Sequence, residues 1–295
     1  MSSKEVSILI NKINSFPTLP TVAIQVVQTT SNPKSSARDL MDIINPDISL
    51  TTKILKIANS PFYGLSREID SLQHAVTILG FKEIRNLVLS TVVFDSFKNL
   101  KEHAKFDIKK FWKHSFVCGV AANILAAEMK KASNEFFVAG LIHDIGKLVI
   151  YITLPNEFFK LIDVTGSLKL KFETFQAEKD ILGMTHGEVG MSLLKRWNFP
   201  ENLRTAVGFH HHPQETDKKS LLTFVVHTAD ILAHIYEMPA EEKDGNSLKT
   251  ETFYPDIIKQ ALTFGIKWDG PDLDRFRQTL AEGIERETET LSLFF

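Results

Sequence analysis

The string His143-Asp144-Ile145-Gly146-Lys147 places a histidine, an aspartate and a lysine within five residues, and more residues of the same types lie on either side of it. Imidazole is a good ligand for zinc, iron and nickel ions, and a carboxylate can bridge two ions. Two neighbouring metals can activate a water molecule and hold a phosphate group. Seven residues on apolar segments therefore indicate a metal pocket: His114, His143, Asp144, His186, His210, His211 and Asp230.

Each of these residues also has a structural interpretation. An isolated His-Asp pair is more simply a helix terminus, His114 has the aromatic surroundings of a packed core histidine, and His186 follows a potential capping residue, Thr185. The run His210–His212 is less easily explained, because the chain has only 10 histidines in 295 residues. An unpaired buried carboxylate is costly, so Asp230 in an apolar helix needs a metal or a basic partner. Taken together, the ligand-type residues and the order of their segments favour a metal pocket over these structural interpretations.

The spacing inside the string sets conditions on the local structure. Adjacent residues such as His143 and Asp144 point about 100° apart on a helix, so both reach one metal only at a helix end or over a shallow pocket. Gly146 permits the close backbone approach or the turn that such a site needs. Lys147 could bind a phosphate as a point charge or could only reach solvent. The histidines outside the pattern are interpreted as structural or surface residues: His74, His103, His227 and His234.

The elements that carry these residues are predicted to be helices throughout. Apolar residues recur at helical spacing, and capping residues or prolines mark where helices begin. These start signals are Thr21, Ser36, Asp47, Ser71, Ser133, Pro155, Thr185, Pro200 and Ser220, and two further helices are expected to begin near Phe81 and Ile108. The helix from Ile108 to about Lys130 carries His114, and the helix that Ser133 opens is expected to carry both His143 and Asp144. No strand series or repeat is visible, so the predicted fold class is all-α.

Composition limits the classes of function. A chain of 295 residues with 43% hydrophobic residues can bury a large core. Its net charge of -2 gives no basic field, so we expect no DNA binding and no attraction to an anionic membrane. A single cysteine, Cys118, excludes an internal disulfide and indicates a reducing compartment. The N-terminal residues do not resemble a secretory signal, and the apolar stretches are too short to span a bilayer, so we expect a cytoplasmic protein.

The polar segment Lys98–Asp107 divides the chain into parts. We expect an N-terminal helical lobe over residues 1–100 and a metal-pocket lobe over residues 101–240. Residues 241–295 are expected to form a C-terminal helical tail packed on the rest. Lys98–Asp107 would then be a hinge between the two lobes.

Three segments of the N-terminal half resemble the HDOD domain, an all-helical bacterial signalling module: Phe16–Pro20, Ile44–Leu55 and Ala58–Gly64. The C-terminal half is similar to the HD superfamily of metal-dependent phosphohydrolases, and to its HD-GYP branch in the pattern of ligands. The resemblance covers roughly Phe16 to Ala233. It implies an N-terminal helical lobe packed on an HD-type helical bundle.

The resemblance also implies one or two divalent transition metals, with iron, manganese, nickel and zinc as candidates. In the HD-GYP pattern one metal is ligated by His114, His143, Asp144 and Asp230. The other is ligated by His186, His210 and His211, with Asp144 bridging the two ions. HDOD domains are generally regulatory and commonly lack these ligands, whereas HD-GYP proteins use them to hydrolyse cyclic di-GMP.

The chain departs from the HD-GYP pattern at two points. After the histidine pair it has His212-Pro213-Gln214 instead of Gly-Tyr-Pro, which counts against cyclic di-GMP as a substrate. Lys110 stands four residues before His114, where members with three metals have a glutamate, and this argues against a third metal.

We therefore expect a regulatory module with a retained metal pocket, and with a signalling protein or a nucleotide as its partner. The alternative is an active metal-dependent phosphohydrolase acting on a nucleotide or cyclic dinucleotide, in which Asp144 and Lys147 would carry catalysis. A purely structural role for the histidines and aspartates is the third and least favoured interpretation.

Overall fold

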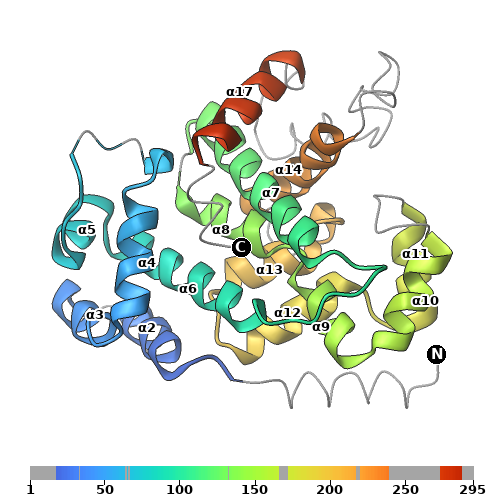
Figure 1. Cartoon of the computed structure of the whole chain (residues 1–295), viewed down its shortest axis with the longest axis horizontal. Coiled ribbons are helices and arrows are strands. Elements are labelled where there is room, and N and C mark those ends of the chain that lie inside the picture. Colours follow the sequence, from blue (N-terminus) through green and yellow to red (C-terminus); the bar gives the residue numbers. More distant parts are fainter. Residues whose placement is uncertain are drawn as a thin grey trace. The chain divides into compact units, whose positions relative to one another are not determined.

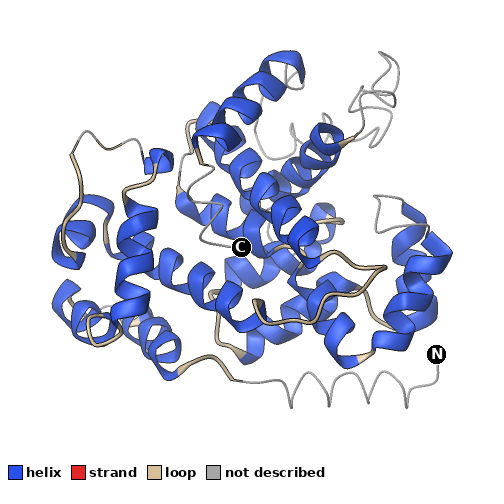
Figure 2. Ribbon diagram, in the orientation of Figure 1, coloured by secondary structure: helices blue, strands red, loops and turns tan. Residues whose placement is uncertain are grey.

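Helices dominate the part of the chain that the computed structural model describes (Figure 1, Figure 2). That part comprises residues 18–32, 34–63, 65, 67–131, 133–165, 172–216, 220–238 and 273–287. Within these ranges there is no β-strand, and the only extended pairing is an isolated bridge between His103 and Phe106. The all-α class predicted from the sequence is confirmed.

The chain folds into two compact units, and the division falls between Lys101 and Glu102, inside the segment Lys98–Asp107. One unit, here called the first, contains Thr18–Lys101 together with the described residues from Ala281 on. The other, here called the second, contains the described residues from Glu102 to Leu280. The domain limits of the sequence analysis and the packing of the C-terminal tail stay predictions. Most of that tail lies outside the described residues, apart from helix α17 (Leu273–Arg286).

Local capping explains where the helices of the first unit begin. These elements are α2 (Thr21–Ser31), α3 (Ala37–Ile44), α4 (Ile48–Ala58), the 3-10 turn η1 (Pro61–Tyr63), α5 (Leu72–Leu79) and α6 (Phe81–Phe97). The side chains of Ser36, Asp47 and Ser71 each accept a hydrogen bond from a backbone N–H in the first turn. Such a cap contributes about 1 kcal/mol. Helices α2, α4 and α5 pack against the apolar α6.

The side chain of Asn59 ties the end of α4 to the segment before α5. Its amide nitrogen donates to the carbonyl of Ile69 at 2.8 Å, and its amide oxygen accepts from the Ile69 N–H at 2.6 Å. Ile69 is buried, so both backbone groups are satisfied away from water. This pair of hydrogen bonds gives a structural role to Asn59 in the segment Ala58–Gly64, one of those that resemble the HDOD domain. Gly64 itself lies outside the described residues.

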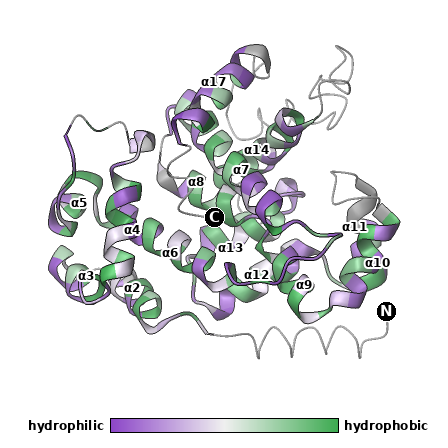
Figure 3. Cartoon of the chain, viewed as in Figure 1, coloured by the Kyte–Doolittle hydropathy of each residue, from purple (hydrophilic) through white to green (hydrophobic). Residues whose placement is uncertain are grey.

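The second unit is a bundle of longer helices. It contains α7 (Ile108–Glu128), α8 (Asn134–Ile142), α9 (Ile145–Thr153), α10 (Pro155–Thr165), α11 (Phe172–Leu182), α12 (His186–Arg196), α13 (Glu201–Phe209), the turn η2 (Pro213–Glu215) and α14 (Leu221–Glu237). Helix α7 packs on α8 and α14, and α12 packs on α9 and α13. Figure 3 shows hydrophobic residues along α7, α8 and α14, the helices of this packed centre.

The helical path from Asn134 to Thr153 is broken at His143 and Asp144. His143 is the C-cap of α8, and Asp144 immediately precedes α9. The sequence predicted a single helix through both residues; the structure instead places them at the junction of two. A helix end is one of the settings in which adjacent side chains can reach one pocket, and the donor atoms of His143 and Asp144 do lie in one group.

One helical stretch among the described residues, Glu135–Thr153, is long and apolar enough to cross a membrane by composition. However, 83% of its most apolar window is buried inside the protein. The core helix of a globular protein has the same properties, so this stretch is weak evidence for a membrane span.

Candidate metal centre

Ligand-type side chains converge in the second unit from helices that are distant in sequence. His114 comes from the middle of α7, the His143-Asp144 pair from the α8–α9 junction, and Asp230 from the middle of α14. His186 is the first residue of α12, while His210 and His211 directly follow α13. The structure thus brings together all seven residues that the sequence singled out, here called the His/Asp cluster. The five histidines converge as expected.

Asp144 lies between two groups of histidines. It forms one group with His186, His210 and His211, and another with His114 and His143, and within each group the donor atoms lie within 4.8 Å of one another. Its Oδ1 atom is 3.2 Å from His186 Nε2, and its Oδ2 atom is 3.4 Å from His143 Nε2. Donors that share a metal at about 2.1 Å lie about 3.0–3.4 Å apart, so these separations suit ligation.

The backbone orients two of the imidazole rings. His143 Nδ1 donates to the carbonyl of Gly140 at 2.7 Å, and His210 Nδ1 donates to the carbonyl of Val207 at 2.8 Å. These bonds leave the Nε2 atom of His143 3.4 Å from Oδ2 of Asp144, and the Nε2 atom of His210 3.7 Å from Oδ1 of the same residue. Ligating histidines in metal sites are fixed in this way by the partner of their other nitrogen.

Two carboxylates orient two further rings. Glu178 contacts His186 Nδ1 at 2.7 Å, and Glu237 contacts His114 Nδ1 at 2.9 Å. The side chain of Glu178 is completely buried, whereas that of Glu237 is 22% exposed. The Nε2 atoms of both histidines again point toward the aspartates of the cluster.

The electrostatics of the pocket favour charged carboxylates. Burial raises the pKa of Asp144, but His143 and Lys147 lower it by more, so this pKa lies well below its ordinary value.

The histidines of the cluster divide into two groups. Burial and the neighbouring histidines hold the pKa values of His210 and His211 well below their usual range. Burial lowers the pKa of the other three as well, but the carboxylates beside them raise it by more, to about 9 for His114 and above the ordinary value for His143 and His186. His210 and His211 are thus in the neutral state that a transition metal binds, whereas the other three would release a proton on binding.

The pocket also contains buried polar atoms that make no hydrogen bond. His143 Nε2 and Asp144 Oδ1 are both in this condition, and both residues are at most 2% exposed. Leaving such atoms without a hydrogen bond costs free energy, and a metal ion would satisfy them. The donors present therefore fit a divalent transition metal.

Lys147 lies inside this pocket. It is 8% exposed, and its Nζ atom is 2.5 Å from Asp144 Oδ2. Of the two interpretations that the sequence left open, the one in which Lys147 only reaches solvent is therefore wrong. Its ammonium group engages a carboxylate of the His/Asp cluster.

Gly146 allows two helices of the pocket to touch. A Cβ atom at this position would lie 1.9 Å from the carbonyl oxygen of His186 and 2.8 Å from the backbone nitrogen of Gly190. Only glycine permits α9 and α12 to approach this closely. This contact holds His186 beside Asp144, as the close-approach prediction for Gly146 requires.

Three residues beside the expected ligands were not predicted from the sequence: Glu178, His234 and Glu237. His227 has the structural role expected of it, because its Nδ1 atom donates to the carbonyl of His210 at 2.6 Å. His234 forms a possible metal group with His114 and Asp230. The spacing of four residues from Asp230 to His234 was an available signal. Glu178 and Glu237 offered none, because a glutamate in a helix is ordinarily solvated.

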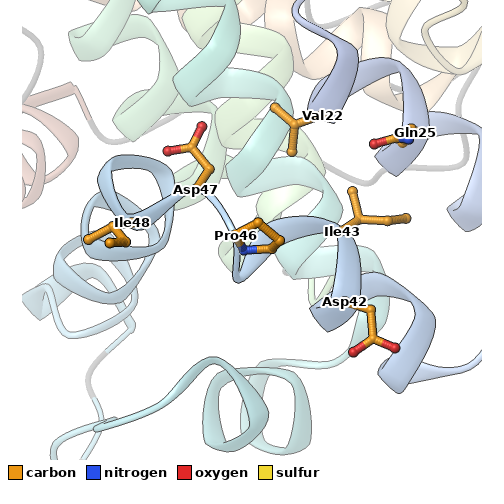
Figure 4. Close-up of a pocket in the computed structure, with 7 residues that line it drawn as sticks. All are labelled: Val22, Gln25, Asp42, Ile43, Pro46, Asp47 and Ile48. Atoms are coloured by element: carbon orange, nitrogen blue, oxygen red, sulfur yellow. The ribbon is translucent and has the colours of Figure 1, made fainter.

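The first unit has a hollow of its own. Figure 4 shows that it is lined by Val22, Gln25, Asp42, Ile43, Pro46, Asp47 and Ile48. These residues come from α2, α3 and the start of α4. Asp47 is used as the N-cap of α4, where it accepts from the Leu50 N–H. The lining includes no histidine, and we assign it no chemistry.

The helical bundle with its His/Asp cluster defines an HD-type helical protein. The chain belongs to the HDOD family, whose model matches residues 16–213 under the description "HDOD domain". Comparison with curated proteins finds an uncharacterized protein of Treponema pallidum, 23% identical over 289 residues. The match covers 97% of this chain and 53% of that protein, so the chain spans about half the length of this relative.

Solved structures with the same fold extend over the whole chain. A candidate phosphohydrolase from Shewanella amazonensis has a TM-score of 0.73 at 22% identity, with 98% of each chain covered. An HDOD domain protein of unknown function from Geobacter sulfurreducens has a TM-score of 0.67 at 22% identity, with 98% of this chain and 96% of that chain covered. At this level of identity the likeness shows the HD-type helical fold, as the sequence predicted.

Proposed function

We propose that this protein is a regulatory HDOD module whose second unit binds one or two divalent transition metals in the His/Asp cluster. The observation that carries the proposal is the burial of the converged donors. His143 is 0% exposed, and Asp144 and Asp230 are each 2% exposed. A site closed by protein ligands suits a structural or sensing metal, whereas a catalytic metal keeps a position open to substrate.

The cluster divides naturally between two ions. One would be held by His114, His143, Asp144 and Asp230, and the other by His186, His210 and His211, with Asp144 between them. Mixed imidazole and carboxylate donors suit iron, manganese, nickel and zinc, so the donor set does not select one of these ions.

Metal occupancy would act on the stability of the second unit. The donors belong to α7, the α8–α9 junction, α12, α14 and the end of α13, so bound metal ties these elements together. Metal bound only to the folded state adds about 2.7 kcal/mol when its free concentration is 100 times Kd. We infer that this change controls binding of a signalling protein or a nucleotide, in a cytoplasmic setting that suits the buried thiol of Cys118.

An active phosphohydrolase is the second candidate. The specific observation in its favour is that Lys147 lies beside Asp144, where an ammonium group could meet a phosphate oxygen. Bound metals would supply Lewis-acid chemistry there. In that case Asp144 would hold the ions and Lys147 would bind the phosphate. The regulatory proposal is favoured because Lys147 already engages Asp144 and because Gly-Tyr-Pro is missing after His211.

Elemental analysis combined with an activity screen tests the proposal. The purified, never-chelated protein should contain metal, and the His74→Ala variant, altered in the first unit, should contain the same amount. With manganese, iron or nickel supplied, phosphate esters and cyclic dinucleotides should not turn over above background. Metal-dependent turnover by the wild type that is lost in an Asp144→Ala variant shown to be folded would establish the hydrolase instead. Protein without metal would refute both candidates.

A further inference from the structure

The last three turns of α14 carry a row of ligand-type residues beyond the predicted set. Asp230, His234 and Glu237 are spaced by four and three residues, which places them on one face of the helix. That face meets His114 of α7: the rings of His114 and His234 have centroids 4.2 Å apart. Glu237 contacts the Nδ1 atom of the same His114 at 2.9 Å.

Three imidazole nitrogens surround a single carboxylate oxygen, Asp230 Oδ1. The Nε2 atom of His114 lies 3.1 Å from it, and that of His143 lies 3.5 Å from it. The Nε2 atom of His234 lies 3.4 Å from the same oxygen. Two donors at about 2.1 Å from one metal are separated by about 3.0 Å at a right angle and about 3.4 Å at a tetrahedral angle. His234 therefore stands in the same relation to Asp230 as the two expected ligands do.

We propose that His234 is an additional ligand of the metal held by His114, and that Glu237 positions His114 for that metal. This inference rests on the proposed metal pocket. A simple helical ion pair between Asp230 and His234 would not explain why His114 and His143 approach the same oxygen. A shared cation does explain it.

The extra ligand makes the two metal positions unequal. With His234, the metal beside His114 would have five protein donors: His114, His143, Asp144, Asp230 and His234. The metal beside His186 would have four. A position filled by imidazole is closed to water and substrate, which suits regulation better than hydrolysis. The added nitrogen also favours zinc, nickel and iron over manganese.

Exposure places His234 and Glu237 at the edge of the pocket. Their side chains are 21% and 22% exposed, whereas that of His114 is 10% exposed. The side chains of Asp230 and His143 are 3% and 0% exposed. An entering ion would meet His234 and Glu237 before the buried donors, so this pair would control metal exchange.

Cobalt substitution tests the inference without relying on activity. Full-length wild type, His234→Ala, His234→Gln, Glu237→Gln and the control His74→Ala would be loaded with Co²⁺. The measurements are cobalt content, affinity by chelator competition and the visible absorption spectrum. His234→Ala and His234→Gln should each alter the spectrum and weaken one cobalt position by about 100-fold, since a nitrogen ligand is lost. Glu237→Gln should weaken it by about 10-fold, as for other partners of ligating histidines.

The outcomes separate this inference from the proposed pocket. Wild type that binds no cobalt would refute the pocket itself. Wild type that binds cobalt, with His234→Gln unchanged in spectrum and affinity, would refute the role of His234 and leave the pocket standing. His234→Gln retains a polar side chain of similar size, and melting of the metal-free variants reports any folding defect separately. His74→Ala should match wild type in every measurement.

Discussion

His186 Nδ1 lies 2.7 Å from Oε1 of Glu178, a carboxylate whose side chain is completely buried. The other oxygen of Glu178 accepts the backbone N–H of His186 at 2.9 Å. One carboxylate thus fixes both the ring and the backbone of the first residue of α12. It leaves His186 Nε2 directed at Asp144, 3.2 Å away.

Glu178→Gln should therefore weaken metal binding. A glutamine side chain has one acceptor oxygen and a donor NH₂ group, so it cannot accept from both nitrogens of His186 as the carboxylate does. We expect metal affinity to fall by about 10- to 100-fold, measured by chelator competition. Glu128→Gln, at the exposed end of α7, is the matched control and should leave affinity unchanged. Equal affinity in both variants would show that Glu178 does not support the site.

Asp144→Ala should remove metal and destabilise the second unit. The change leaves the buried ammonium of Lys147 without its carboxylate, and breaking such a buried pair costs about 3–5 kcal/mol. Chemical denaturation and elemental analysis would measure the two effects. The double variant Asp144→Ala/Lys147→Met should recover stability but not metal. Retention of the full metal content in Asp144→Ala would contradict the central position of this residue.

Gly146→Ala should separate α9 from α12. The added methyl group would lie 1.9 Å from a backbone oxygen, which no side-chain rotation relieves. We expect a loss of about 3 kcal/mol or more in unfolding free energy, at the upper end for overpacked cores. Metal content should fall too, because His186 would move away from Asp144. The comparison variant Ala127→Gly, at an exposed helical position, should lower the unfolding free energy by only about 1 kcal/mol. If Gly146→Ala lowers it by no more than that, the close contact between α9 and α12 is contradicted.

Asn59→Ala should destabilise the first unit and leave the metal content unchanged. The substitution strands the backbone N–H and carbonyl of buried Ile69, at a cost of about 1–3 kcal/mol. Urea denaturation would give the change in stability, and elemental analysis would give the metal content. Gln73→Ala, at an exposed position of α5, should have little effect on either quantity. A lowered metal content in Asn59→Ala would show that the pocket depends on the first unit.

Local signals explain which parts of the fold could be predicted. Helices begin directly after Ser36, Asp47, Ser71, Thr185 and Ser220, as expected, because an N-cap depends only on residues one turn away. The convergence of the His/Asp cluster was also expected, because its residues match the HD-GYP ligand pattern in order. The break between α8 and α9 was not, because the apolar sequence around His143 and Asp144 satisfies helical spacing on both sides.

The residues that the sequence did not reveal are those whose role depends on tertiary packing. Glu178 lies in a charged helix, and its burial against His186 distinguishes it from exposed neighbours such as Asp180. Glu237 likewise acquires its role from His114, which is 123 residues away in the sequence. His234 did have a local signal, since it follows Asp230 by one helical turn. His234 has no counterpart in the HD-GYP ligand pattern, so that pattern did not predict it.

The contact between Lys147 and Asp144 gives the pocket a built-in monovalent cation. Because this ammonium group neutralises Asp144, the second unit should remain folded after its metal is removed, unlike small zinc modules that unfold when chelated. Circular dichroism before and after chelation would show whether helix content is retained. The protein could then bind and release metal reversibly while it stays folded, because the ammonium group of Lys147 neutralises the charge of Asp144 when no ion is bound.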